Sequence, residues 1–335
     1  MIKKAYLGLL LLVCSLAYGQ EGVPVYMDYF ADNLYLLHPS MAGASSSNKI
    51  RLTARQQWFD HSKAPNLQTL SYNGRVGERS GVGVIVFNDQ NGYHSQIGGY
   101  LTYAHHLMMG SSYSDLNQLS FGINAGMVQS RLDESYFDPS IYDPIVAGIV
   151  QSTSYFNIDV GTSYNLNNLS LHLTVKNLLF QNRDMYTEQF ESNNQRRYIA
   201  SASYTIAPQR SDWMYEPSVM FQLVERTGEK TIDTNFKVYR NFDFGRLWLG
   251  VSYRQSFDGA EYLKGNQVKS QKLRYLTPVL GVNYRNFMAA YTYSYQTGDV
   301  LFDNGGYHQI TLGYDIGGDR RGRNRSFNCD CPAVN

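Results

Sequence analysis

Residues 169–176 read Leu-Ser-Leu-His-Leu-Thr-Val-Lys, so apolar and polar side chains alternate with a period of two residues. On a β-strand this period places the three leucines and Val175 on one face, and His172 and Lys176 on the other. The same alternation recurs in residues 156–164, 287–296 and 308–316. Strands with one apolar and one polar face form a wall between two different surroundings.

The whole chain can be divided in this way into fourteen segments, separated by clusters of Gly, Asn, Asp and Ser. They are residues 48–58, 66–76, 80–88, 95–106, 116–128, 152–164, 168–178, 197–206, 214–226, 230–239, 245–256, 272–284, 286–296 and 305–316. An even number of strands, joined by alternating short and longer connections, is typical of a bacterial outer-membrane barrel. We therefore predict an all-β fold, a transmembrane antiparallel up-and-down β-barrel over residues 48–316 with both termini in the periplasm.

The composition agrees with a barrel better than with its rivals. The mean hydropathy is −0.37, too polar for a bundle of membrane helices, whereas polar residues facing a lumen would dilute the apolar ones that face lipid. A soluble β-sandwich also alternates, but strands of about ten residues exceed its usual five or six. The 28 tyrosines concentrate near strand ends, as in aromatic girdles. A net charge of +1 favours no nucleic-acid partner.

The residues outside the barrel form three further segments. Residues 1–19 predict a signal peptide, because Lys3 and Lys4 precede an apolar run that ends in a small-x-small cleavage site at Gly19. Residues 20–47 lack the alternation but are rich in Tyr and Leu, which predicts a periplasmic leader or a plug buried in the lumen. Residues 317–335 carry four arginines and predict a basic periplasmic tail.

The polar faces of the strands supply the candidate lumen-lining residues. They are Asp159, His172, Lys176, Asp233, Lys237, Arg254 and Asp315. Such residues can line a channel or anchor a plug, but a polar interior is also what these barrels ordinarily have. The sequence contains no HExxH or GxSxG motif, and adjacent His105 and His106 would face opposite sides of a strand. We therefore predict no metal, no cofactor and no enzymatic activity; a hydrolase would need Ser and His to meet on neighbouring strands.

Several short motifs follow one another in the first third of the chain. They are Pro39-Ser40-Met41-Ala42-Gly43, Arg55-Gln56-Gln57-Trp58, Ala64-Pro65 and Gly81-Val82-Gly83-Val84, followed by Asp89 and Gly92. In these motifs the chain resembles the PorP/SprF family of the type IX secretion system of Bacteroidetes, most strongly over residues 35–106. His38 departs from the family pattern, which usually has Asn there. Physically, Pro39 and Gly43 would fix a turn, and Gly81 and Gly83 would leave space on the lumen face.

The resemblance implies both a role and a set of partner-binding or family-motif residues. These residues are Pro39, Ala42, Gly43, Arg55, Gln57, Trp58, Pro65, Gly81 and Gly83. The implied role is a non-enzymatic component of the secretion and gliding-motility machinery, which docks or anchors one secreted, adhesin-like surface protein. Its implied partners are that protein or its C-terminal domain, other type IX secretion or gliding components, and outer-membrane lipid. The alternative is a passive porin or an uptake channel for a small solute.

Overall fold

The structure is a computed structural model that describes residues 33–57, 63–109, 116–135, 148–180, 194–264, 267–297 and 306–317, without the side chains of residues 260–271. The predicted signal peptide, most of the leader and the basic tail lie outside the described residues. Within the described residues, no helix is long and apolar enough to cross a membrane.

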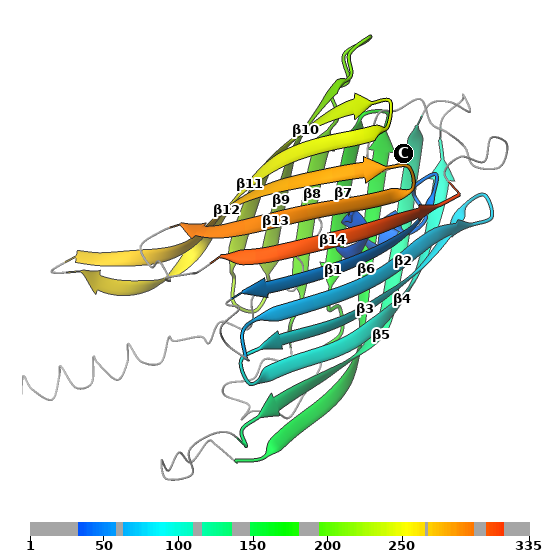
Figure 1. The fold of residues 1–335 in the computed structure, drawn as a ribbon. Coiled ribbons are helices and arrows are strands. Elements are labelled where there is room, and N and C mark those ends of the chain that lie inside the picture. Colours follow the sequence, from blue (N-terminus) through cyan, green and yellow to red (C-terminus); the bar gives the residue numbers. More distant parts are fainter. Residues whose placement is uncertain are drawn as a thin grey trace, which may run out of the picture.

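Fourteen antiparallel strands close into one barrel, in which each strand pairs with its neighbours in the chain and β1 pairs with β14 (Figure 1). The strands are β1 (Asn48–Gln57), β2 (Asn66–Val76), β3 (Ser80–Asn91), β4 (His94–Met108), β5 (Asn117–Asp133), β6 (Val150–Leu166), β7 (Leu169–Lys176), β8 (Arg197–Tyr204), β9 (Trp213–Val224), β10 (Lys230–Phe242), β11 (Gly245–Lys264), β12 (Gln267–Tyr284), β13 (Phe287–Thr297) and β14 (Tyr307–Ile316). The prediction of a fourteen-stranded up-and-down barrel is confirmed. We call the end where the chain enters β1 and leaves β14 the proximal end, and the opposite end the distal end.

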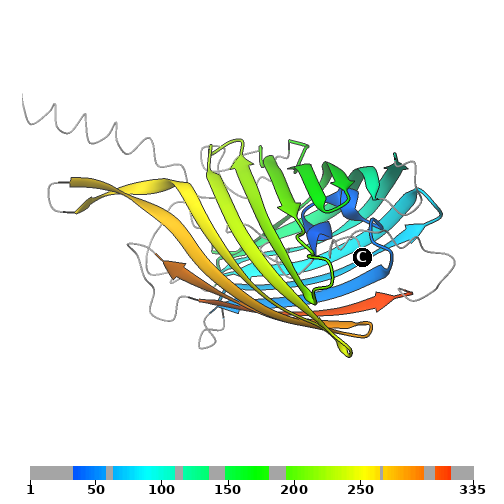
Figure 2. The same cartoon turned by 90° about the horizontal axis from the view of Figure 1, so that it is seen from above.

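The strands differ in length much more than the alternation indicates. β7 and β8 have 8 residues each, whereas β11 has 20 and β12 has 18. The last partner of β10 on β11 is Ser256, and the last partner of β13 on β12 is Arg274, so beyond these residues β11 and β12 pair only with each other. The result is a hairpin that projects past the distal rim of the wall (Figures 1 and 2).

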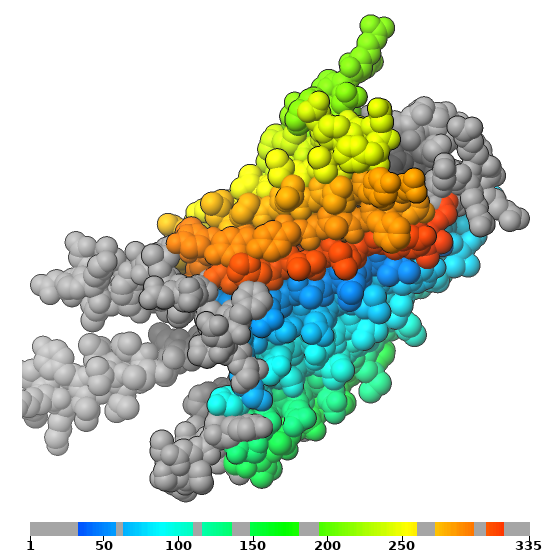
Figure 3. All heavy atoms as spheres, viewed as in Figure 1, coloured from blue at the N-terminus to red at the C-terminus, as the bar shows by residue number. Residues whose placement is uncertain are grey.

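The two faces of each strand meet different surroundings, as the alternation predicts. On β7, Leu173 is 58% exposed on the outer face, whereas the neighbouring His172 is 2% exposed on the inner face. Leu101 and Leu249, 70% and 60% exposed, belong to the same outer apolar surface. Figure 3 shows part of this outer surface as a continuous wall over β10–β14 and β1–β5. The burial of large side chains therefore takes place inside the barrel.

The inside of the barrel holds a piece of the chain that precedes β1. Residues 33–47, which we call the inner segment, contain two single-turn 3₁₀ helices, η2 (Leu34–Leu36) and η3 (Pro39–Met41). The blue ribbon in Figure 2 shows this segment enclosed by the wall. Its side chains Tyr35, Leu36 and Met41 form one apolar cluster with residues of β3, β4, β5 and β6.

Candidate functional site

The local sequence of the inner segment explains why it is compact. Pro39 occupies the first turn of η3, where its missing N–H leaves no helical hydrogen bond unmade. Gly43 ends the turn with a φ of +67°, a backbone conformation that side chains disfavour. A Cβ at Gly43 would also lie 2.7 Å from the carbonyl oxygen of Gly74 on β2. The turn predicted between Pro39 and Gly43 therefore lies against the wall and needs glycine at its end.

Glycines of the wall make room for the inner segment. A Cβ at Gly81 would collide with the carbonyl oxygen of Ala42, and one at Gly83 with the hydroxyl of Tyr35. Gly122 on β5 leaves the same kind of space for the backbone between Pro39 and Ser40. The wall is thus hollowed where the inner segment approaches it.

Three backbone carbonyl groups of the inner segment are satisfied by side chains of the wall. Lys176 Nζ on β7 donates to Leu36 O at 2.8 Å, and Arg75 Nε on β2 donates to Gly43 O at 2.8 Å. His106 Nε2 on β4 lies 3.0 Å from Ala42 O. Because a buried carbonyl without a partner is costly, these bonds compensate for taking the irregular backbone out of water.

His38 connects the inner segment to two neighbouring strands. Its Nδ1 lies 2.9 Å from Thr174 Oγ1 on β7, and its Nε2 lies 2.9 Å from Ser201 Oγ on β8. Its ring stacks on His172 with 4.8 Å between the centroids. Complete burial lowers the pKa of His38 well below its ordinary value, and His172 and Lys176 lower it further. His38 is therefore neutral and bridges β7 and β8, and its side chain does not cap η3.

The arrangement of Ser163 and His172 resembles part of a hydrolase site. They are partners in the pairing of β6 with β7, and Ser163 Oγ lies 2.7 Å from His172 Nδ1. The hydroxyl of Ser40 lies 2.6 Å from that of Ser163, and Ser163 and His172 are no more than 2% exposed. Both side chains lie beneath the inner segment and not on the outer face. In this position they join the inner segment to the wall.

The other half of the interior is filled by the strands themselves. Near the proximal end, an apolar cluster of β9–β13 has Tyr239 and Trp248 at its centre, 0% and 1% exposed, with Met214, Val279 and Met288 around them. A Cβ at Gly281 would collide with the indole of Trp248, so the ring packs directly on the backbone of β12 at this glycine.

Closer to the distal end, charged side chains occupy the lumen. Arg254 of β11 makes two hydrogen bonds to Asp233 of β10, with Nε–Oδ1 and Nη2–Oδ2 distances of 2.5 and 2.6 Å. Both residues are at most 5% exposed. Arg55 of β1 is 7% exposed and lies over the ring of Tyr307 at 5.1 Å. Ion pairs and packed rings thus occupy this half of the lumen.

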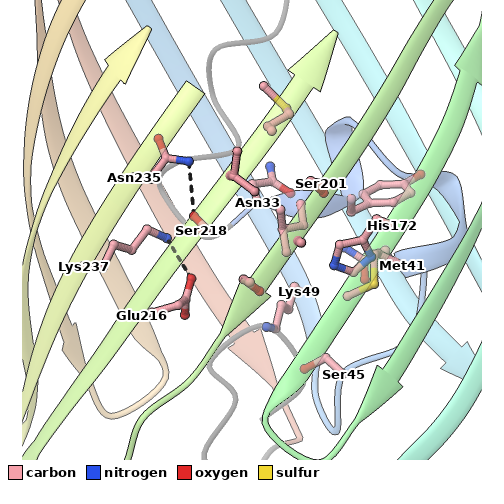
Figure 4. A pocket seen from close by; sticks show the side chains of 17 residues that line it. Asn33, Met41, Ser45, Lys49, His172, Ser201, Glu216, Ser218, Asn235 and Lys237 are labelled. Carbon is pink, nitrogen blue, oxygen red and sulfur yellow. Dashed lines mark hydrogen bonds and ion pairs between the residues drawn. The ribbon is translucent and has the colours of Figure 1, made fainter. Parts of the chain in front are cut away.

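A small cavity of about 50 Å³ remains between the inner segment and the side chains of β9 and β10. Figure 4 shows it between the inner segment, represented by Asn33, Met41 and Ser45, and the wall residues Glu216 and Lys237, which face each other from β9 and β10. The Lys237 Nζ–Glu216 Oε1 distance is 4.0 Å. A cavity of this size has room for a few water molecules.

The residues singled out in the sequence fall into four groups. The seven lumen-lining candidates lie on the inner face, and six are buried; Asp315 is 28% exposed and makes a 2.6 Å ion pair with Arg51 across the β1–β14 junction. The motif residues Pro39, Ala42 and Gly43 belong to the inner segment, and Gly81 and Gly83 lie under it. Arg55 and Gln57 face the lumen near the distal end, where the N–H of Gln57 donates to Pro65 O at 3.0 Å. Trp58 lies outside the described residues.

Other residues of this site were missed in the sequence. Gly122, Arg75, His106 and Ser163 contact the inner segment but come from strands with no motif of their own. Their signal was only that of a small or polar residue at an inward position. Which part of the inner segment an inward residue contacts depends on how the closed barrel arranges its strands.

Comparison with known protein families identifies the family to which this barrel and its inner segment belong. The family model of the type IX secretion system membrane protein PorP/SprF matches residues 19–314. The chain belongs to the PorP/SprF family. This PorP/SprF protein is accordingly an outer-membrane β-barrel, and its outer apolar face meets lipid. No curated protein matches its sequence.

Solved structures similar to this PorP/SprF protein are outer-membrane barrels. The CymD monoaromatic hydrocarbon channel is 11% identical, with 90% of this chain and 96% of that chain covered and a TM-score of 0.47. Omp33 of Acinetobacter baumannii is 7% identical over 82% of this chain and all of its own, with a TM-score of 0.40. The toluene transporter TodX of P. putida is 10% identical over 81% and 90%, with a TM-score of 0.39.

Proposed function

We propose that this PorP/SprF protein is a non-enzymatic component of the type IX secretion and gliding machinery that docks one secreted surface protein in the outer membrane. The observation that carries the proposal is the filled lumen. A passive pore needs a continuous aqueous path lined by exposed polar groups. Here the inner segment covers the inward residues of β2–β8, and Trp248, Tyr239 and the Arg254–Asp233 pair fill the space along β9–β12.

A filled barrel offers a partner its rims instead of its interior. The inner segment is tied to the wall through Lys176, Arg75 and His38, which makes the proximal opening a fixed surface. At the distal rim the β11–β12 hairpin projects beyond its neighbours. The partners we propose are the C-terminal domain of the secreted protein and other secretion or gliding components. Burial of Ser163 and His172 supports the non-enzymatic role.

Site-specific photo-cross-linking in cells tests the docking role. A photoreactive residue is placed at Tyr93 in the distal β3–β4 turn, at Arg285 in the proximal β12–β13 turn, and, as the control, at the lipid-facing Leu101. We expect a secreted surface protein or a secretion component to be captured from one of the two turns and not from Leu101. Recovery of no such protein from either turn, with the barrel correctly inserted, would contradict the proposal.

Conductance of the purified barrel in planar bilayers separates docking from passive transport. We expect the wild-type protein to show no large, steady ion current, because side chains fill the lumen. A large and steady current would favour the alternative of a porin or small-solute channel.

A further inference from the structure

Arg240 is an arginine on the lipid-facing side of the wall. It lies on β10, where Tyr239 points into the lumen and is 0% exposed, so Arg240 points outward. Distal to it on the same face of β10 are Val238 and Phe236, the latter 44% exposed. Arg240 therefore interrupts the outward apolar side chains of β10 close to the proximal end, where aromatic side chains follow it, as is typical of the membrane–water interface.

Two aromatic rings flank the guanidinium group. The Cζ atom of Arg240 lies 5.0 Å from the ring centroid of Trp213, its pairing partner on β9, and 4.8 Å from that of Phe242. The ring of Phe242 in turn stacks on Phe244 with 5.2 Å between the centroids. Cation–π contacts of this kind hold the charge in place at the membrane surface.

The aromatic rings leave the hydrogen-bonding capacity of Arg240 unused. Guanidinium carries five N–H donors, and neither ring provides a conventional acceptor. In the part of the chain that the structure describes, the guanidinium of Arg240 makes ring contacts but no hydrogen bond or ion pair. An anchored, lipid-facing cation with open donors is suited to an anionic acceptor that resides at this depth, and a planar guanidinium matches a phosphate.

We propose that Arg240, Trp213 and Phe242 form a binding site for the phosphate group of a membrane phospholipid. The phosphate accepts hydrogen bonds from the guanidinium, while the acyl chains of the same lipid lie along the apolar face formed by Val238, Phe236 and Val219. The site is on the outer wall and is independent of the docking role proposed above, so either proposal can fail without the other.

Native mass spectrometry of delipidated, detergent-solubilised protein tests the site. The probes are phosphatidylglycerol, a diacylglycerol with the same acyl chains but no phosphate, and inorganic phosphate. We expect the wild-type protein to retain phosphatidylglycerol in preference to diacylglycerol. Arg240→Gln should weaken this retention about tenfold, the effect of losing one charge-assisted hydrogen bond, and Trp213→Leu should weaken it less.

Arg285→Gln is the matched control. Arg285 is exposed in the β12–β13 turn at the same end of the barrel and lies over one ring, that of Tyr284, at 5.3 Å. Its replacement removes the same charge and should leave phosphatidylglycerol retention unchanged. Folding of each variant is checked by heat-modifiable migration in gels, and Arg240→Lys provides a second variant at the site.

Three results would overturn the proposal. Equal retention of phosphatidylglycerol and diacylglycerol would show that the phosphate is not recognised. An equal loss in Arg240→Gln and Arg285→Gln would indicate general attraction to a basic rim. Displacement of the lipid by millimolar inorganic phosphate would assign the site to the free anion.

Discussion

The ammonium group of Lys176 on β7 donates a 2.8 Å hydrogen bond to the backbone carbonyl of Leu36 in the inner segment. Lys176 is 7% exposed, so this bond is formed out of water between a charged donor and the carbonyl group of the last residue of η2. It ties an irregular segment to a strand 140 residues further along the chain.

Replacing Lys176 with methionine should loosen the inner segment while leaving the wall intact. Loss of a hydrogen bond to a charged group, with a buried carbonyl left unpaired, should cost about 1.5–3 kcal/mol. We expect faster proteolysis before β1 and a lower unfolding temperature in detergent. Lys230→Met, at an exposed position where β10 begins, is the control and should behave as wild type. Equal protease resistance of the two variants would disprove a retaining role for Lys176.

A side chain at Gly122 should displace the inner segment. Gly122→Val would place methyl groups where the backbone of Pro39 and Ser40 lies, and backbone cannot move aside as a flexible side chain can. We expect an inserted barrel with measurable ion conductance in planar bilayers. Gly99→Ala is the control, because a Cβ there would meet its nearest atom, Ile85 O, at 3.4 Å. A Gly122→Val barrel that stays closed would mean that the lumen is sealed without the inner segment.

Acid should weaken the docking of the inner segment through His38. Its pKa is held below the ordinary value of 6.5 when docked, so the undocked form binds more protons below that pH. The stabilisation is complete above the ordinary pKa and declines as the pH falls toward the docked pKa, by up to about 1.4 kcal/mol per pH unit. Protease sensitivity before β1 should therefore rise between pH 7.5 and pH 5. The slope should be smaller in His38→Gln, and an unchanged slope would assign the effect to another group.

Replacing only one residue of the Arg254–Asp233 pair should lower the unfolding free energy much more than replacing both. Asp233→Asn leaves a buried guanidinium without its counter-charge, and we expect a loss of about 3–5 kcal/mol of unfolding free energy. The double variant Asp233→Leu/Arg254→Met should recover most of that loss, since two apolar groups need no partner. Denaturant unfolding in detergent measures both. If the double variant is as unstable as the single one, the pair does more than neutralise its own charges.

The number of strands and the facing of their side chains were predictable because alternation is a local property. In residues 169–176 the polarity of each side chain indicates whether it faces the lumen or the outside, and the same holds through most of the wall. The prediction ended β11 at residue 256, whereas the strand continues to Lys264. The reason is a shift of register between Gln255 and Gly259, which breaks the phase of the alternation at that point. A local pattern cannot be followed through a bulge.

The fit between the inner segment and the wall was predictable only in part. Gly81 and Gly83, two residues apart, signalled open space on one face of β3, and the inner segment lies there. Gly122 occupies the same kind of position on β5 without a second glycine two residues before it. His38 appeared as a departure from the family motif, but its partners Thr174 and Ser201 are 136 and 163 residues away. Such contacts depend on which strands lie next to the inner segment in the closed barrel, and the alternation along a single strand contains no information about that.

The ring closes where β1 pairs with β14, and Arg51 and Asp315 form an ion pair across this seam. These two strands are the first and the last of the barrel, so the ring is complete only when every strand, β14 included, has paired with its neighbours. The inner segment makes hydrogen bonds to β2, β4, β6, β7 and β8, which all come before β9 in the chain. We therefore expect the inner segment to be in place before the ring closes, as a template for the growing wall. A chain truncated after β9 should already protect residues 33–47 from protease.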